Sequence, residues 1–286
     1  MNSPQAIVPS RGLLRRWLDA DPLRQRAVMA LSAAPEQVYL VGGSVRDALL
    51  GLEGYDLDVA VAGDALTLGR RLADALGGAY VPLDAARNVA RVVVRQGGSY
   101  RHIDLAGLRA ADILGDLRAR DFTINAMAAP LQPTLGDLLD PTGGQSDLAA
   151  QTLRAAYAGA FQDDPLRVLR GVRLAGVLAL RWTSETEDLA RKALPALPAV
   201  SGERRRDELF NILALPCAAS VCAHPLAQEA LRAALSPLRN AALRPALQTL
   251  SLLETSFPCG PDVSPWRWLG RFQGTLCDYW RGELSV

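Results

Sequence analysis

Residues 39–63 have the sequence YLVGGSVRDALLGLEGYDLDVAVAG, and this stretch decides the fold. The apolar run 38–41 predicts a buried strand that leads directly into Gly42-Gly43-Ser44, and residues 45–50 then have helical spacing. A strand, a tight glycine turn and a helix N-terminus leave backbone N–H groups without partners, and such groups can bind phosphate. This order of elements predicts a phosphate-binding turn.

Two aspartates follow on a second predicted strand, residues 56–61. Side chains alternate along a strand, so Asp56 and Asp58 face the same side of the sheet. Carboxylates this close repel each other unless a cation lies between them, and oxygen-only ligands suit Mg²⁺. A solvated strand edge is the alternative for such a pair alone. Its occurrence just after a glycine turn, with Arg46-Asp47 in between, favours a metal and nucleotide site.

The form GGSVRD-ALLG-…-YDLDVAVAG resembles the head-domain signature of the DNA polymerase beta-like nucleotidyltransferases, and within them the class II tRNA nucleotidyltransferase and bacterial poly(A) polymerase family. The resemblance covers about residues 38–213. It implies an α+β protein with a polymerase beta-like α/β head built on a mixed sheet, followed by an all-α neck and a short body. It also implies a two-metal Mg²⁺ site at Asp56 and Asp58. The residues implied to hold the nucleotide in this stretch are Gly42, Gly43, Ser44, Arg46 and Asp47.

A third carboxylate is expected on the strand predicted over residues 100–105, YRHIDL. Its alternation places His102 and Asp104 on one face. Members of the family have an acidic residue at this point, so the resemblance implies Asp104 as a further catalytic and metal-binding residue. A surface aspartate on an edge strand is the alternative.

The segment 118–128, RARDFTINAMA, resembles the family motif RRDFTINAMA, which holds the ribose and triphosphate of the incoming nucleotide. Arg120 can neutralise phosphate charge, and Asp121 and Asn125 can hydrogen-bond a ribose hydroxyl. Ala119 departs from the motif, which usually has a first arginine there. The preceding residues 105–120 lack a long polar insertion where CCA-adding members carry a flexible loop, and this favours a CC-adding enzyme.

Residues 163–175, DDPLRVLRGVRLA, predict a helix with Pro165 in its first turn and Asp163 or Asp164 as N-cap. The segment resembles the family's EDxxR template, in which an Asp and an Arg select CTP or ATP. Because Asp164 and Arg167 are three residues apart, we expect them to share a helix face. A capped helix with a basic face is the alternative. Arg170 and Arg173 on the same predicted helix are further nucleotide-binding candidates. Residues 201–209, SGERRRDEL, resemble the family's ER-x-x-EL motif, which implies Glu203 and Arg204 as supports of this helix, and a plain charged helix face is the alternative.

The predicted domains are a helical arm (1–36), the nucleotidyltransferase head (37–148), the helical neck (149–215) and a short helical body or tail (216–286). With 49% apolar and 21% charged residues and a net charge of +1, the composition is that of an ordinary globular protein. The apolar runs are too short to span a bilayer, and no signal peptide is recognised. Four cysteines, irregularly spaced, indicate reduced thiols and a cytoplasmic protein without membrane partners.

The expected activity is template-independent, metal-dependent addition of CTP- or ATP-derived nucleotides to the 3′ end of tRNA, with CC addition favoured. A-adding or CCA-adding tRNA nucleotidyltransferases and poly(A) polymerase remain alternatives with the same chemistry. A catalytically silent RNA-binding homologue is the alternative from another class. The sequence leaves open the oligomeric state, the way the short C-terminal region grips tRNA, and whether a partner enzyme completes the CCA end.

Overall fold

The computed structural model describes residues 10–54, 56–235 and 248 of the chain. The chain divides into two compact units, and each is described by itself. The first comprises residues up to 150 together with 154–157, and the second comprises residues 151–153 and those from 158 on.

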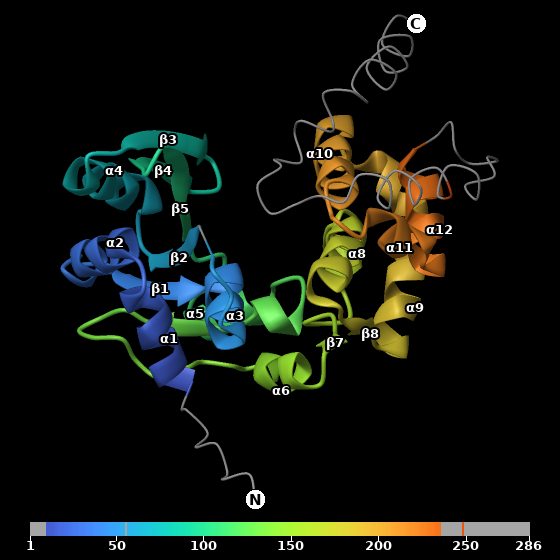
Figure 1. Ribbon diagram of the computed structural model, residues 1–286, viewed down its shortest axis with the longest axis horizontal. Coiled ribbons are helices and arrows are strands. Elements are labelled where there is room, and N and C mark those ends of the chain that lie inside the picture. The colour runs from blue at the N-terminus through green and yellow to red at the C-terminus, as the bar shows by residue number, and fades with distance from the viewer. Residues whose placement is uncertain (1–9, 55, 236–247, 249–286) are drawn as a thin grey trace, which may run out of the picture. The chain divides into compact units, whose positions relative to one another are not determined.

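A six-stranded sheet with the order β3-β4-β5-β2-β1-β6 forms the centre of the first unit (Figure 1). Its strands are β1 (Gln37–Val41), β2 (Leu57–Ala62), β3 (Ala79–Asp84), β4 (Val89–Gln96), β5 (Ser99–Gly107) and β6 (Ala128–Pro130). The pair β2–β5 is parallel, whereas the other neighbouring strands are antiparallel. The prediction of an α+β protein with a mixed sheet is confirmed.

Helices accompany this sheet along the chain. They are α1 (Ser10–Asp19), α2 (Pro22–Ser32), α3 (Gly42–Leu50), α4 (Ala65–Leu76), α5 (Ile113–Arg118), α6 (Gly144–Ala149) and the 3₁₀ helix η1 (Thr123–Asn125). The amphipathic spacing of residues 65–76, followed by Gly77-Gly78, predicts a helix, and α4 has these bounds. Asp64 caps its first N–H groups and Gly77 ends it in the left-handed conformation. It packs against β3, β4 and β5 (Figure 1).

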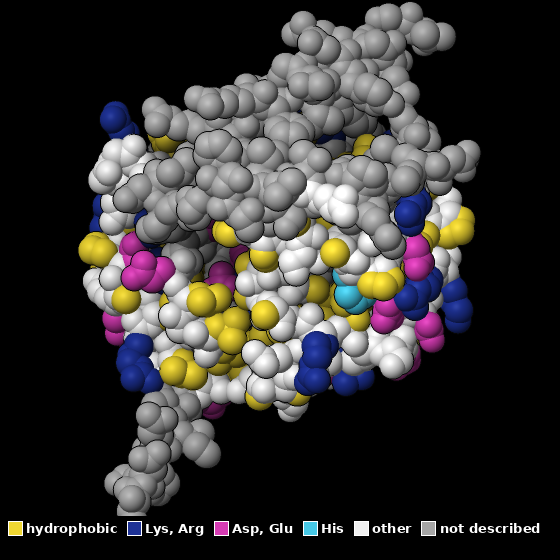
Figure 2. All heavy atoms as spheres, turned by 45° about the vertical axis from the view of Figure 1, so that its right-hand side comes forward, with side chains coloured by type: hydrophobic (Ala, Val, Ile, Leu, Met, Phe, Trp, Pro, Cys, Tyr) yellow, Lys and Arg dark blue, Asp and Glu magenta, His cyan; other side chains and the backbone are white. Residues whose placement is uncertain are grey.

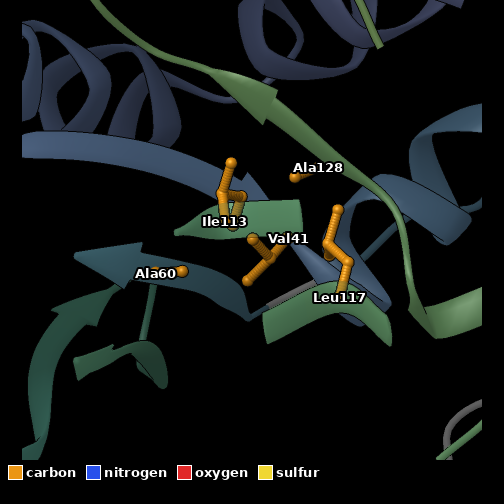
Figure 3. Close-up of a cluster of buried hydrophobic side chains, with 5 residues drawn as sticks. All are labelled: Val41, Ala60, Ile113, Leu117 and Ala128. Carbon is orange, nitrogen blue, oxygen red and sulfur yellow. The ribbon is translucent and has the colours of Figure 1, made fainter. Parts of the chain in front are cut away.

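A cluster of buried apolar side chains lies where β1 ends and the glycine turn begins (Figure 3). Its members are Val41, Ala60, Ile113, Leu117 and Ala128. They come from β1, β2, α5 and β6, so the short helix α5 is anchored to three strands of the sheet. Burial of these side chains fixes the end of β1 and therefore the position of the turn that follows it.

The N-terminal arm consists of two helices rather than one. Helix α1 ends at Asp19 and α2 begins at Pro22. The Asp21 side chain caps α2 by accepting hydrogen bonds from the N–H groups of Leu23 and Arg24. Trp17 on α1 is buried and donates its indole N–H to the carbonyl of Leu52 at 2.8 Å. The arm thus packs within the first unit and supports the loop that leads to Asp56.

The second unit is helical apart from a two-stranded parallel sheet. Its elements are β7 (Thr152–Leu153), α7 (Ala160–Asp163), α8 (Arg167–Leu178), β8 (Arg181–Trp182), α9 (Ser184–Ala193), η2 (Leu194–Ala199), α10 (Gly202–Leu213), α11 (Ala218–Ala223) and α12 (Pro225–Ala234). Apart from residue 248, the predicted tail beyond 235 lies outside the described residues.

None of the helices in the described ranges has the length and apolar character needed to cross a membrane. Figure 2 shows basic side chains at several separate places on the face in view, some of them beside acidic ones. This scattering agrees with the net charge of +1.

Candidate active site

The glycine turn brings charged side chains from three segments together. Gly42 has φ +62°, a left-handed conformation that suits glycine, and α3 starts at this residue rather than at residue 45 as predicted. A Cβ on Gly42 would lie 3.0 Å from Nη1 of Arg120. A Cβ on Gly43 would lie 2.9 Å from Oδ2 of Asp58 and 3.4 Å from Nη2 of Arg46. The missing side chains therefore leave room for a carboxylate and two guanidinium groups around one helix N-terminus that has no side-chain cap.

Asp58 is the electrostatic centre of this arrangement. Burial raises the pKa of its carboxyl group above the ordinary value, and the negative charge of Asp104 raises it further. The positive charges of Arg120 and Arg46 lower the pKa only in part. A buried carboxylate with a carboxylate neighbour is stabilised in its charged form when a cation binds.

The other two predicted carboxylates lie on the same part of the sheet but have protein partners. Asp104 is opposite Asp58 in the parallel register of β5 and β2, and both its oxygens accept hydrogen bonds from Arg91. Asp56 immediately precedes β2, is exposed, and accepts a hydrogen bond from the backbone N–H of His102 at 3.3 Å. Among the described residues, no group of three or more His, Cys, Asp or Glu side chains is arranged to hold a metal ion.

The donor set fits Mg²⁺ at Asp56 and Asp58. Both side chains offer only oxygen, the ligand that Mg²⁺ prefers, and the ion needs only one or two carboxylates besides water and substrate phosphates. The pKa of Asp58 is raised by burial and then by Asp104, and a bound cation would offset both effects. Asp104 is less available to a metal, because Arg91 donates a hydrogen bond to each of its oxygens.

Ser44 positions the two aspartates through the backbone. Its buried hydroxyl group accepts a hydrogen bond from the N–H of Asp58 at 2.7 Å and lies 3.3 Å from the carbonyl oxygen of Asp56, to which it donates. The helix after the turn is thus tied directly to the start of β2.

A polar network joins the glycine-turn helix to the second motif. Arg46 donates to Asn125 Oδ1 at 2.7 Å and to Asp47 Oδ1 at 2.7–2.8 Å. Asn125 in turn donates to Asp121 at 3.2 Å, and both residues are buried. The structure therefore brings four predicted nucleotide-binding residues together, and it holds Asp121 and Asn125 in fixed orientations.

Arg120 is oriented by a residue that sequence reasoning missed. Its Nε and Nη2 donate to Oδ2 of buried Asp116 at 3.1 and 3.0 Å, and Asp116 also accepts from the N–H of Arg109. These two bonds leave the Nη1 side of the guanidinium group near Gly42. The four-residue spacing of Asp116 and Arg120 was the available signal, since such pairs can meet on a helix.

The predicted base-selecting residues lie in the second unit, and one expectation about them is wrong. Asp164 does not share a helix face with Arg167, because it has an extended backbone between α7 and α8, and α8 begins only at Arg167. Its carboxylate accepts from the N–H of Leu166 at 3.2 Å, which resembles a cap but lies before the helix. Its other oxygen accepts from Arg204 on α10 at 2.6 Å. Arg204 therefore contacts the segment that it was predicted to support.

Arg167, Arg170 and Arg173 all lie on α8, and the partner of Arg173 was not predicted. Arg173 donates to Glu208 of α10 at 2.5 Å, and the Glu208 side chain is only 9% exposed. This ion pair and the Asp164–Arg204 pair fasten both ends of the segment 164–173 to one helix.

We expect the substitution Arg173→Met to lower the free energy of unfolding by about 2 kcal/mol, because it leaves the buried Glu208 carboxylate without its partner. The double substitution Arg173→Met/Glu208→Met should recover most of this loss, since it removes both charges. Thermal unfolding of the full chain measures both effects. Equal destabilisation by the single and double variants would contradict this account.

Comparisons with known proteins agree with the geometry. The family model described as "Poly A polymerase head domain" matches residues 38–154. A CC-adding tRNA nucleotidyltransferase of Geobacter sulfurreducens is 45% identical over 178 residues, which cover 62% of this chain and 40% of that protein. An A-adding tRNA nucleotidyltransferase of Halalkalibacterium halodurans is 37% identical over 191 residues, which cover 63% of this chain and 45% of that protein. The chain therefore spans less than half the length of these curated relatives.

A solved structure described as a CCA-adding enzyme in complex with ATP superimposes with a TM-score of 0.74 at 30% sequence identity. The superposition covers 89% of this chain and 63% of that one. The similarity thus extends beyond the head into the second unit.

Proposed function

Because the chain belongs to the class II tRNA nucleotidyltransferase and poly(A) polymerase family, we propose that it transfers nucleotidyl groups from CTP or ATP to the 3′ end of tRNA. The observation that carries this proposal is the convergence of Asp58, Arg46 and Arg120 on the Gly42-Gly43 turn. Carboxylates for a metal, guanidinium groups for phosphate and an uncapped helix N-terminus are what nucleotidyl transfer requires in one place.

In this proposal the triphosphate binds at the glycine turn. The N-terminus of α3 and the guanidinium groups of Arg46 and Arg120 neutralise its charge, and Asp116 keeps Arg120 turned toward the turn. Asp121 and Asn125, fixed by their hydrogen bonds, orient the ribose. Catalysis by these residues is positioning and charge neutralisation, without a covalent intermediate.

Asp56 and Asp58, with Asp104 beside them, would hold Mg²⁺. When bound, the metal supplies activation of the RNA 3′-hydroxyl group and stabilisation of the leaving pyrophosphate. Ser44 keeps the two aspartates in register with the glycine turn through its bonds to their backbone.

Asp164 and Arg167 would select the base by paired hydrogen bonds, each worth about 1–3 kcal/mol of discrimination. Arg204 supports this role by holding one oxygen of Asp164. The second unit thereby contributes nucleotide choice, and the first contributes the chemistry.

CC addition is the favoured specificity. The residues between β5 and the second motif include α5, whose Ile113 and Leu117 are buried in the core cluster, so this part of the described chain forms packed structure rather than a long polar loop. The similarity to a CC-adding relative supports the same choice. A-adding relatives share the same region, so A addition is the second candidate.

The test uses full-length protein with Mg²⁺ and tRNA transcripts that end at the discriminator base, after one C, or after CC. Each transcript is given CTP or ATP alone, and products are resolved at single-nucleotide length. Two Cs on the bare end and no A are expected. A single A on the CC end would identify an A-adding enzyme, many As on unrelated RNA a poly(A) polymerase, and no transfer on any end would overturn the proposed activity.

A further inference from the structure

Three charged residues form a row across the sheet beside the glycine turn. Arg91 on β4 is directly opposite Asp104 on β5 in the antiparallel register, and Asp104 is opposite Asp58 on β2 in the parallel register. Residues opposite each other on paired strands project from the same face of a sheet. The order along this row is therefore cation, carboxylate, carboxylate.

The contact between Arg91 and Asp104 engages both oxygens of the carboxylate group. Arg91 Nε lies 2.7 Å from Oδ1 and Nη2 lies 2.7 Å from Oδ2, the bidentate geometry that gives strong pairing. The hydrogen bonds to Asp104 raise the pKa of Arg91, and the charges of Asp104, Asp56 and Asp58 raise it further. Arg91 is thus held by Asp104 at the end of this row of charges.

We propose that Arg91 is an internal counter-cation that competes with a divalent metal ion for Asp104. This inference rests on the proposed function and names a positioning residue within it. With Arg91 in place, Asp104 adds no net charge, and Asp56 and Asp58 together match one divalent cation. Coordination of a metal by Asp104 is opposed by the positive charge of Arg91 and by the two hydrogen bonds that Arg91 donates to it.

The test measures Mn²⁺ binding to the full chain without nucleotide. The decrease in the electron paramagnetic resonance signal of free Mn²⁺ reports how much metal is bound. Arg91→Leu should tighten Mn²⁺ binding by about tenfold, since it frees Asp104 to bind the metal and also removes a positive charge beside the carboxylates. Arg95→Leu is the matched control, because Arg95 lies on the same strand and the same face but pairs in register with Tyr100 rather than with an acidic residue. It should change the affinity by less than about twofold.

A second pair of variants tests competition directly. In the presence of Arg91, Asp104→Asn should weaken Mn²⁺ binding by no more than about threefold, because no metal ligand is lost while Arg91 holds Asp104 and only the uncompensated charge of Arg91 then opposes the metal. In the Arg91→Leu background the same substitution should abolish the tenfold gain. Arg91→Lys keeps the positive charge but loses the bidentate guanidinium contact, so its Mn²⁺ affinity should lie between those of the wild type and Arg91→Leu. Circular dichroism checks that each variant is folded.

Two results would overturn the inference while leaving the metal site intact. One is Mn²⁺ binding by Arg91→Leu no tighter than by Arg95→Leu, and the other is an equal effect of Asp104→Asn in both backgrounds. Failure of the proposed function is distinguishable, because then Asp58→Asn would not weaken Mn²⁺ binding at all.

Discussion

Asp58→Asn is expected to reduce nucleotide transfer by about 10³-fold or more while the protein stays folded. The amide has the shape of the carboxylate but neither its charge nor its affinity for a metal. Because Asp58 faces the Gly43 turn and lies between Arg46, Arg120 and Asp104, its loss removes the central negative charge of the site. Single-turnover extension of a tRNA transcript, with Mg²⁺ and CTP in excess, measures the effect.

The same substitution should raise the thermal stability of the metal-free protein. The raised pKa of Asp58 means that the folded state disfavours its charged form, chiefly because of burial and then because of Asp104. As the pH rises from below the unfolded pKa of this carboxyl group through its folded pKa, wild-type stability should therefore fall relative to that of Asp58→Asn. Melting temperatures without metal at pH 4 and pH 7 test this sign.

Asp74→Asn on α4 is the matched control for Asp58→Asn, because Asp74 is exposed on the same unit and lies away from the glycine turn. It should leave transfer unchanged within about twofold, as is usual for surface substitutions. Activity of Asp58→Asn within tenfold of wild type would contradict its catalytic assignment. A melting temperature below that of wild type at pH 7 would contradict the electrostatic account.

Gly144→Ala is expected to destabilise the first unit by about 1–3 kcal/mol. An added Cβ would lie 2.3 Å from the carbonyl oxygen of Thr123 and 2.9 Å from its carbonyl carbon, so backbone must move. That carbonyl oxygen also accepts a hydrogen bond from the N–H of Ala126 at 2.9 Å, which keeps it in place. The clash therefore reaches η1, the 3₁₀ helix that carries Asn125.

The functional consequence of Gly144→Ala should be a KM for CTP raised by about tenfold. Displacement of η1 disturbs the hydrogen bonds that connect Asn125 with Arg46 and Asp121, and these residues orient the nucleotide in our proposal. Steady-state extension at varied CTP concentration separates this KM effect from a loss of folded protein, which thermal unfolding reports.

Gly202→Ala provides the control for an added methyl group, because a Cβ at the first residue of α10 meets nothing within 4 Å. It should leave stability unchanged or raise it by about 0.5–1 kcal/mol, since alanine suits a helix better than glycine. Equal stabilities of Gly144→Ala and Gly202→Ala would show that the contact with Thr123 relaxes without cost.

Local pattern alone predicted most elements of the first unit. The amphipathic spacing of residues 65–76 with Gly77 after it gave α4 its correct bounds, since helix periodicity and a left-handed C-terminal glycine are properties of adjacent residues. Alternation placed Asp56 and Asp58 on one side of their strand, and the family resemblance added Asp104, which the structure has opposite Asp58.

Single residues at element ends were less predictable. Asp164 was expected on a helix with Arg167, yet the helix starts at Arg167 and Asp164 is extended. Helix boundaries depend on which partner satisfies the terminal groups, and here Asp164 bonds both the N–H of Leu166 and the side chain of Arg204, which is distant in sequence.

The sequence by itself therefore determined the succession of elements, the glycine turn and the candidate carboxylates. The tertiary structure decided which charged side chains pair with each other: Asp104 with Arg91, Arg120 with Asp116, and Arg173 with Glu208. The physical reason is that charge pairing acts through space between side chains that folding brings within hydrogen-bonding distance. Charge pairing therefore follows no periodic pattern in the sequence. Even Asp116 and Arg120, four residues apart, meet only because α5 is packed into the core.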